Sequence, residues 1–404
     1  MQADDIIVDA SLGWSGANVL ALDAWQSVLV EKPVSVSGAG GLSVATDDGG
    51  KNGYFGFLGK GHVTFANLSD MLTISGSAYT LVGDIATLAA DIAQNPAGDY
   101  ALANDYDAKI DGIYATSPIP TEFGGNFEGL GNTISRLSID DPENADYVGL
   151  FARPASGSTV ENTRLLKLSI SGNAGDVGGI AAVSFGFISN DFVSGTLISS
   201  VQNGGAYIGG LVGYNSGMIT RSHATGTIGS DQFGTTGGGL VGYNFNGSIT
   251  QSYADCVVSS GDDGGLGGLV GSNAGPITQS YSMGSVAGGD GTWVGGLTGA
   301  NGMITQAYST TALKDLGHKN HDAGGLIGVD KAGGNSSDYW DTSTSRIKKL
   351  NEGAGTPKND PGITGLTTEQ LQSGLPSGFD PKVWAEDPKI NGGFPYLINN
   401  PPRE

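Results

Sequence analysis

The sequence predicts an all-β protein that folds as a right-handed parallel β-helix, with coils of about 29 residues, a short helix near residues 84–95 and a C-terminal cap. Three observations lead to this prediction. Glycine supplies 70 of the 404 residues, far more than in an ordinary domain. A unit that begins with two glycines recurs at nearly constant intervals. The residues between the glycines are mostly Ser, Thr, Val, Ile and Tyr, which favour strands and turns over helices.

The repeat is most regular between residues 178 and 334. The intervals between the first glycines of successive units are 31, 29, 29, 28 and 29 residues, with these glycines at Gly178, Gly209, Gly238, Gly267, Gly295 and Gly324. One unit has room for three short strands and their corners, so we expect one coil per repeat. In the unit from Gly238 the expected strands are GGLVGY, SITQSYA and CVVSS. Coils stacked at the ~4.8 Å strand spacing would form parallel sheets.

Two other interpretations fit the sequence less well. A β-propeller needs blades of about forty residues built from antiparallel hairpins, whereas this repeat is shorter and carries no hairpin signal. A disordered low-complexity chain would not keep Leu, Val, Ile and Tyr at fixed positions between its glycines. A β-solenoid is therefore the expected architecture.

Equivalent residues of successive coils are expected to lie above one another. A leucine column would fill the core, asparagine amides would bond to each other at a corner, and glycines shortly after them would adopt positive φ. The members are Leu211, Leu240, Leu269, Leu297 and Leu326; Asn215, Asn244, Asn273 and Asn301; and Gly217, Gly247, Gly275 and Gly302.

The segment ITQSY of the repeat supplies the candidate binding residues. Strand alternation places its Gln or Arg on the same side as its ring, and the long polar side chains favour solvent there. Its Thr and Ser would then point inward, and the preceding Ile would sit at a corner. Exposed rings could stack on a sugar or a partner protein, or simply on each other. The candidate ligand-binding residues are His223, Tyr253, Tyr281, Tyr308, Arg221, Gln251 and Gln279.

Four segments are expected along the chain. Residues 1–83 read as solenoid coils of shorter period, and residues 84–147 as a short helix followed by irregular coils. In that helix Asp84 would be the N-cap, and Ile85, Leu88, Ala89 and Ile92 would share one face. Residues 148–334 hold the regular repeats, and residues 335–404 would cap the last coil, because an open end exposes an unpaired strand. Thr367 and Gln370 match a capping box. The residues expected to cover the last coil are Trp340, Trp384, Phe394 and Tyr396.

Charge and composition exclude several functions. The chain has 19 basic and 40 acidic residues, a formal charge of −21, which disfavours nucleic acid and anionic lipid as partners. Its single cysteine, Cys256, excludes an intrachain disulfide framework. No apolar run is long enough for membrane insertion, and MQADDIIVDA lacks the features of a signal peptide. We expect a monomeric fragment of a longer chain.

The unit GGLVGYN…ITQSYA resembles the GLUG motif, which occurs in arrays in large secreted bacterial surface proteins. Five good copies within residues 178–334 carry this resemblance. FGGNFEGLGNTISRLSI and VWAEDPKINGGFPYL resemble the segments that flank such arrays in filamentous-haemagglutinin-like exoproteins. The resemblance implies a secreted right-handed β-helix of the adhesin type, and it brings no binding residue to carry across.

Catalysis and cofactors find little support in the residues. GLUG arrays also resemble a portion of certain immunoglobulin-cleaving metallopeptidases, but the sequence has no HExxH. His318, His321 and Asp322 are close in sequence, yet nothing fixes a third strong zinc ligand. Calcium at the acidic turns stays an alternative to solvated carboxylates. The turns concerned contain Asp255, Asp262, Asp263, Asp290, Asp315 and Asp322. We expect no cofactor and no catalytic residue.

The function expected from the sequence is therefore non-catalytic. The chain would be a secreted or cell-surface β-helix that acts as an adhesin or rigid stalk and binds glycan or protein on a host or neighbouring cell. The main alternative is a polysaccharide lyase or glycoside hydrolase, since many of these are β-helices, and it would require a groove with two convergent carboxylates, or with a carboxylate and an arginine. Binding of ice or a mineral surface through threonine ladders is a third hypothesis, which inward threonines would weaken.

Overall fold

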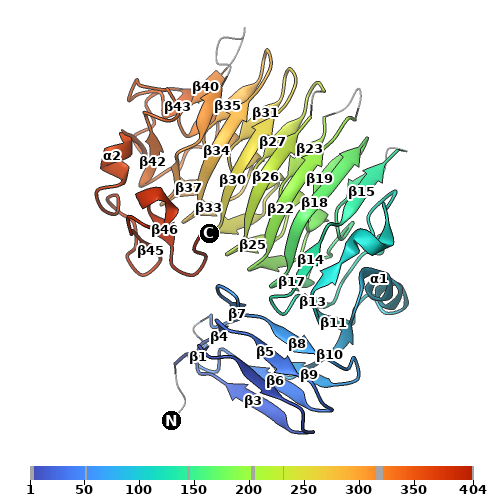
Figure 1. The fold of residues 1–404 in the computed structure, drawn as a ribbon. Coiled ribbons are helices and arrows are strands. Elements are labelled where there is room, and N and C mark those ends of the chain that lie inside the picture. Colours follow the sequence, from blue (N-terminus) through green and yellow to red (C-terminus); the bar gives the residue numbers. More distant parts are fainter. Residues whose placement is uncertain are drawn as a thin grey trace.

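The protein is a parallel β-solenoid of about 11 turns with a spacing of about 29 residues (Figure 1). The computed structural model describes residues 4–50, 52–142, 146–201, 205–230, 232–314 and 322–402. Within these ranges α-helix is confined to α1 (Ile85–Gln94) and α2 (Thr368–Leu371). The predicted all-β solenoid with its coil length is thus confirmed.

Each regular coil contains four short strands rather than the three that were expected. The chain bends at Gly239–Leu240, inside the predicted first strand. It turns again at Gln251, whose φ of 47° places it in the left-handed region and ends the second strand before Ser252. The four strands of this coil are β27 (Thr236–Gly238), β28 (Val241–Asn244), β29 (Ser248–Thr250) and β30 (Tyr253–Ser259).

Stacked coils produce two long sheets, named here by their first and last strands. The β3–β37 sheet has 12 strands and extends from the N-terminal coils to strand β37. Its strands, in spatial order, are β3 (Val19–Asp23), β6 (Gly41–Ala45), β9 (Met71–Ile74), β10 (Ser77–Val82), β11 (Asp99–Leu102), β13 (Asn126–Glu128), β17 (Thr159–Glu161), β21 (Phe187–Ser189), β25 (Met218–Thr220), β29, β33 (Ile277–Thr278) and β37 (Ile304–Thr305).

The β12–β44 sheet also has 12 strands and carries the predicted ring column on its outer face. Its strands are β12 (Tyr106–Asp107), β14 (Thr133–Ser135), β18 (Arg164–Gly172), β22 (Phe192–Ile198), β26 (His223–Gly229), β30, β34 (Tyr281–Ala287), β38 (Tyr308–Ser309), β42 (Asp338–Asp341) and β44 (Ile363–Leu366), with β15 (Ser138–Asp141) paired to β18 and β39 (Ala312–Lys314) paired to β34.

Two sheets of 7 strands complete the larger solenoid. One contains β16 (Tyr147–Val148), β19 (Asp176–Gly178), β23 (Tyr207–Gly209), β27, β31 (Gly265–Gly267), β35 (Trp293–Gly295) and β40 (Asp322–Gly324). The other contains β20 (Ala181–Ser184), β24 (Val212–Asn215), β28, β32 (Val270–Asn273), β36 (Thr298–Ala300), β41 (Ile327–Val329) and β43 (Ala354–Thr356).

The N-terminal coils form a smaller solenoid whose strands run opposite to those of the larger one. Its first coil is shorter than the later ones, since Ile6 pairs with Val28, whereas Val34 pairs with Val63 in the next coil. Besides β3, β6 and β9, it contains β1 (Ile6–Val8), β4 (Val28–Val30), β7 (Phe55–Phe57), β2 (Leu12–Trp14), β5 (Val34–Val36) and β8 (Val63–Phe65).

A tight hairpin between β9 and β10 causes this reversal. Ser75 and Gly76 have φ of 49° and 86°, and the strands they join are antiparallel. The later coils therefore wind back beside the N-terminal ones. Val63 N donates to Leu130 O (2.9 Å), which holds β8 against the larger solenoid, and Figure 1 shows the two solenoids side by side.

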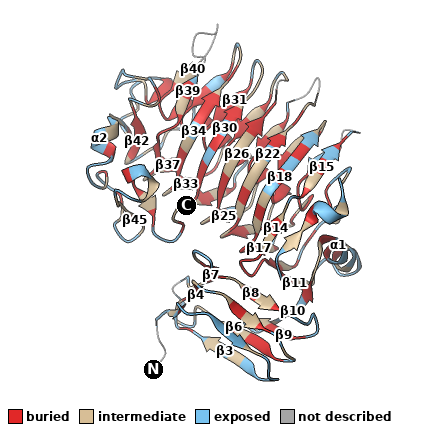
Figure 2. Ribbon diagram, in the orientation of Figure 1, coloured by how far each residue is buried: buried red, intermediate tan, exposed pale blue. Residues whose placement is uncertain are grey.

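The core follows the predicted columns. The five leucines are fully buried, and Figure 2 shows buried residues along the strands of both solenoids. The predicted helix is confirmed as α1, with the Asp84 side chain accepting a hydrogen bond from Thr87 N at 2.7 Å. Its residues Ile85, Leu88 and Ile92 join the main core, so α1 covers the end of the larger solenoid.

The asparagine ladder forms at one corner, but it is shorter than predicted. Asn215 Nδ2 donates to Asn244 Oδ1 (2.8 Å), and Asn244 Nδ2 donates to Asn273 Oδ1 (2.7 Å). Asn273 then bonds to Gly302 O (2.7 Å), so Asn301 does not continue the ladder. The prediction of positive φ for the following glycines is wrong. Gly275 is required because a Cβ there would collide with Gly247 O of the preceding coil.

The C-terminal segment covers a lateral face in addition to the last coil. Trp340 lies in the main core, as predicted for a residue that closes the last coil. Trp384, in contrast, packs against the outer face of the β12–β44 sheet, in a separate apolar cluster. The predicted capping box of Thr367 and Gln370 begins α2, and β45 (Trp384–Ala385) pairs with β46 (Tyr396–Leu397).

Candidate functional site

The predicted ring column exists on the outer face of the β12–β44 sheet, but the prediction that it is exposed is wrong. His223 and Tyr253 are each 3% exposed, and Tyr281 and Tyr308 are 0% exposed. The rings do point away from the core, because their neighbours Ala224 and Ala254 belong to it. They are buried because the C-terminal segment, which lies far away in sequence, packs on them.

The column is a continuous stack of parallel rings. The centroids of His223 and Tyr253 are 4.5 Å apart, those of Tyr253 and Tyr281 4.7 Å, and those of Tyr281 and Tyr308 5.1 Å. Phe192 extends the stack by one coil, 4.3 Å from His223. The strand spacing imposes these separations, so the ladder stabilises the stacking of the coils.

The C-terminal segment seals the tyrosine part of the stack. Trp384 lies 5.8 Å from the Tyr308 ring, and the Tyr308 hydroxyl donates to Pro395 O at 2.6 Å. Burial raises the pKa of Tyr281 and Tyr308 well above the usual value for tyrosine. Three of the seven candidate residues, Tyr253, Tyr281 and Tyr308, are therefore covered by the chain itself.

The Gln and Arg residues lie in a corner column beside the rings. Gln251 Nε2 donates to Gln279 Oε1 at 3.2 Å, and both residues are half-buried. Arg221 donates from Nε to Asn190 Oδ1 at 3.0 Å, and its guanidinium lies 4.0 Å from the centre of the Tyr54 ring. Burial lowers the pKa of Arg221 from its usual value, opposed by Tyr54 and Glu161. The predicted Arg221 thus joins the two solenoids.

The prediction for the small residues of ITQSY is partly wrong. Ile219, Ile249, Ile277 and Ile304 are fully buried in the core, not displaced at corners. Alternation then turns Thr250 and Thr278 outward, where their hydroxyls bond to each other. The serines do point inward, as Ser222 and Ser252 are fully buried. Arg221, Gln251 and Gln279 lie between these threonines and serines, and their left-handed backbone conformation changes the direction of the chain there.

Toward the N-terminal side, the ring column borders a groove. A cavity of about 880 Å³ lies on the outer face of the β12–β44 sheet, next to a second cavity of about 420 Å³. Both are lined by His223, Pro401 and Pro402, so we treat them as one groove. The larger part is also lined by Thr133, Arg164, Leu166, Phe192, Thr225, Tyr253, Asp255, Met283, Lys389, Ile390, Asn391 and Gly392.

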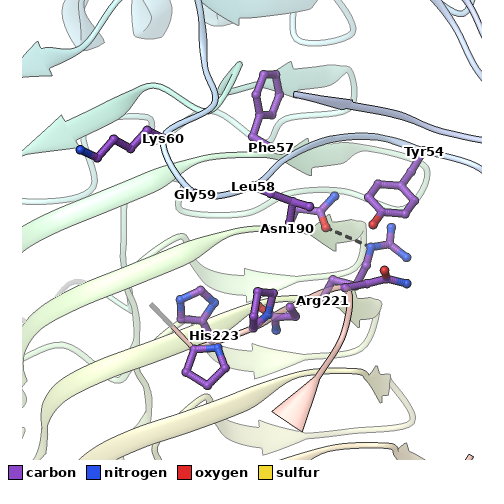
Figure 3. Close-up of a pocket in the computed structure, with 12 residues that line it drawn as sticks. Tyr54, Phe57, Leu58, Gly59, Lys60, Asn190, Arg221 and His223 are labelled. Carbon is purple, nitrogen blue, oxygen red and sulfur yellow. Dashed lines mark hydrogen bonds between the residues drawn. The ribbon is translucent and has the colours of Figure 1, made fainter. Parts of the chain in front are cut away.

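The smaller part of the groove lies beside the loop between β7 and β8. Figure 3 shows Leu58, Gly59 and Lys60 of this loop on the side of the pocket opposite His223, and Arg221 beneath Tyr54 with a hydrogen bond to Asn190. Arg164 Nη2 donates to Gly61 O at 3.2 Å, which fixes the loop beside β18. The N-terminal solenoid therefore supplies one wall of the groove, and the C-terminal segment supplies another.

Sequence reasoning found His223, Tyr253 and Arg221 of this groove but missed Phe192, Arg164 and Lys60. Backbone pairing places Arg164, Phe192, His223 and Tyr253 at equivalent positions of successive coils. The first two could have been found by extending the repeat alignment into its weaker N-terminal copies. Lys60 had no such signal, because the β9–β10 reversal brings it to the groove.

The groove does not have the carboxylate geometry of a glycoside hydrolase. Among the described residues that line the groove, Asp255 is the single acidic residue. Arg164 lies three coils from the strand of Asp255, which at ~4.8 Å per coil is about 14 Å along the solenoid. A hydrolase would need two carboxylates about 5 to 9.5 Å apart across the groove.

A separate carboxyl cluster lies where the two solenoids meet. Glu128 pairs in register with Glu161 on neighbouring strands. Burial raises the pKa of Glu161 to about 7, opposed by Arg221, and burial also raises the pKa of Glu128 and Asp191 strongly. These carboxyls are not among the residues that line the groove.

The metal hypotheses find no cluster to support them in the described part of the chain. No group of three or more His, Cys, Asp or Glu that could hold a metal ion occurs there. Asp262 Oδ1 instead accepts a hydrogen bond from Asp290 N at 2.8 Å. His318, His321 and Asp315 lie outside the described residues.

No described helix has the length and apolar character required to span a bilayer.

Comparison with known proteins connects this fold to one motif. Residues 204–229, essentially the coil from β23 to β26, match the GLUG motif. The protein is a β-solenoid that carries a GLUG motif.

One curated relative and one solved structure show what the chain resembles. A stretch of 155 residues, 36% of the chain, is 34% identical to Halomucin of Haloquadratum walsbyi (strain DSM 16790 / HBSQ001). This match covers only 2% of the length of Halomucin. The crystal structure of a "putative immunoglobulin A1 protease" from Bacteroides ovatus has a TM-score of 0.49 and 18% identity, and it covers 80% of this chain and 93% of that one. At this level the second likeness bears on no property of the site.

Proposed function

We propose that this chain is a non-catalytic, rigid β-solenoid of a secreted or surface protein, and that it binds a carbohydrate chain in the groove of the β12–β44 sheet. The observation that carries the proposal is the groove itself, a cavity of about 880 Å³ beside Phe192 and His223 at one end of the ring stack. Sugar rings stack on aromatic faces, and polar groups around them provide orientation.

The surface location and the adhesin role belong to the same proposal. The GLUG motif and the similarity to Halomucin support a surface protein. The fold is suited to a rigid scaffold for binding, since the strands of each coil hydrogen-bond to those of its neighbours. The filamentous-haemagglutinin-like type of adhesin remains our proposal from the sequence resemblance.

A pair of tryptophan substitutions tests the groove. Thr225 lines the groove, whereas Thr227 faces the same side of β26 two residues further along and does not line it. In a screen against immobilised oligosaccharides, Thr225→Trp should abolish binding by filling the groove, and Thr227→Trp should bind like the unmodified protein. Equal binding by all three proteins would exclude the groove, and absence of any carbohydrate binding would exclude the proposed function.

A further inference from the structure

We propose that the groove selects anionic carbohydrate chains, carrying carboxylate or sulfate groups, over neutral ones. This inference rests on the proposed function and specifies its ligand class. It comes from the charges around the groove, which differ in sign from those of the molecule.

Basic residues dominate the lining of the groove. The whole chain has 19 basic and 40 acidic residues, so a random part of the surface would be acidic. The charged residues that line the groove are instead Lys60, Arg164, Arg221 and Lys389 on the basic side and Asp255 on the acidic side. This reversal gives a local site for an anion on a protein that repels anions elsewhere.

Lys60 and Lys389 can contact a ligand without breaking an ion pair within the described protein. Lys60 and Lys389 are exposed, and the described residues form no ion pair with either ammonium group. The bond from Arg164 to Gly61 O holds the Lys60 loop at the β18 end of the groove. Lys389 immediately precedes Ile390 and Asn391, which line the C-terminal wall. Cations therefore occur on both walls.

The floor between these cations suits a sugar chain. Phe192 is half-buried and stacks on His223, so part of its surface remains accessible beside the basic groups. A pyranose ring can pack on such a surface while its carboxylate or sulfate accepts hydrogen bonds from lysine or arginine. A neutral sugar would pack on the Phe192 surface but would have no charged group for the lysine and arginine side chains.

Matched oligosaccharides separate these possibilities in calorimetric titrations of the full chain. We would compare an oligogalacturonate hexasaccharide, its fully methyl-esterified form and a sulfated chondroitin hexasaccharide. We expect at least one anionic probe to bind about tenfold or more tighter than the neutral ester, with an affinity that falls as salt is raised. The two anionic probes distinguish carboxylate from sulfate recognition.

Lysine variants locate the effect. Lys60→Gln and Lys389→Gln should each weaken binding of the anionic probe about fivefold, because each removes one charge near the ligand. Lys382→Gln should leave the affinity unchanged, since Lys382 is an exposed lysine of the same C-terminal segment outside the groove lining.

Each other outcome has a defined meaning. If neither anionic probe binds tighter than the ester, or if neither groove lysine affects binding, the inference is overturned and the proposed function is left intact. Failure of every oligosaccharide to bind would overturn both. Equally tight binding of a short single-stranded DNA with the same charge would overturn recognition of carbohydrate and indicate a general polyanion site.

Discussion

At the scale of single residues, the ring stack contains two tyrosines in the same column with different hydrogen bonding. The Tyr308 hydroxyl donates to Pro395 O and accepts from Asn391 Nδ2 at 2.9 Å. The Tyr281 hydroxyl is equally buried and has no hydrogen-bond partner among the described residues. Burial of an unpaired hydroxyl opposes folding, so the two hydroxyl groups should have opposite effects on stability.

Removal of each hydroxyl measures this difference. Tyr281→Phe should raise the free energy of unfolding by about 1 kcal/mol, because it removes an unsatisfied polar group. Tyr308→Phe should lower it by about 1 to 3 kcal/mol, because Pro395 O and Asn391 lose a partner. Urea unfolding with an unchanged slope provides both values. A loss of stability in Tyr281→Phe would show that its hydroxyl is satisfied in solution.

At the scale of elements, the features predicted correctly from the sequence are those that depend on local patterns. The leucine column, the start of the asparagine ladder and α1 follow from local periodicity and capping, which neighbouring residues determine. The burial of Tyr253, Tyr281 and Tyr308 could not be predicted in this way. Those rings are covered by Trp384 and Leu397, which belong to a segment without repeats and contact the column only after the chain has folded.

The reversal at Ser75 and Gly76 had a visible signal that was not used. The stretch TISGSAY contains a Ser-Gly pair between two apolar segments, which is a turn signal for a hairpin. Reading it would have predicted that later coils run antiparallel to the first ones. It would not have predicted the groove, because the side chains of Lys60 and Phe192 come from separate solenoids.

The C-terminal segment depends on one aromatic contact, which a substitution can test. Trp384 is 1% exposed and contacts Tyr281, Tyr308 and Phe379. Trp384→Ala should cost about 3 to 5 kcal/mol of packing in this segment. Cleavage by trypsin after the exposed Lys382 and Lys389 should then accelerate, on the order of a hundredfold, if it follows opening of the segment. Trp293→Ala, at a ring that is 41% exposed, is the control and should cleave at the original rate.

At the scale of the whole molecule, the two solenoids meet across buried carboxyls. Glu161 faces Glu128 on the neighbouring strand, with Asp191 and Arg221 also close enough to influence the cluster. Burial raises the pKa of Tyr79, on strand β10, and the negative charges of Glu128 and Glu161 raise it further. Because Glu128 is 3% exposed and Asp191 is 0% exposed, ionisation of these groups is unfavourable in the folded state.

The stability of this junction should therefore fall as pH rises. Glu161 has a pKa of about 7 in the folded protein and an ordinary glutamate value when unfolded, so the folded state holds more protons between these values. The stabilisation is complete below about pH 4.5 and is lost through about pH 7, and Glu161 alone accounts for up to about 3 kcal/mol. Urea unfolding at about pH 5 and about pH 7.5 should show the loss.

Two variants connect the loss to this residue. Glu161→Gln cannot ionise, so its stability should change less over the same pH range, whereas Glu122→Gln, at an exposed carboxylate paired with Arg153, should keep the original dependence. An identical pH dependence in Glu161→Gln and the unmodified protein would contradict the assignment. A smaller dependence would mean that protonation of a buried carboxyl holds the N-terminal solenoid, and with it the Lys60 wall of the groove, against the larger solenoid.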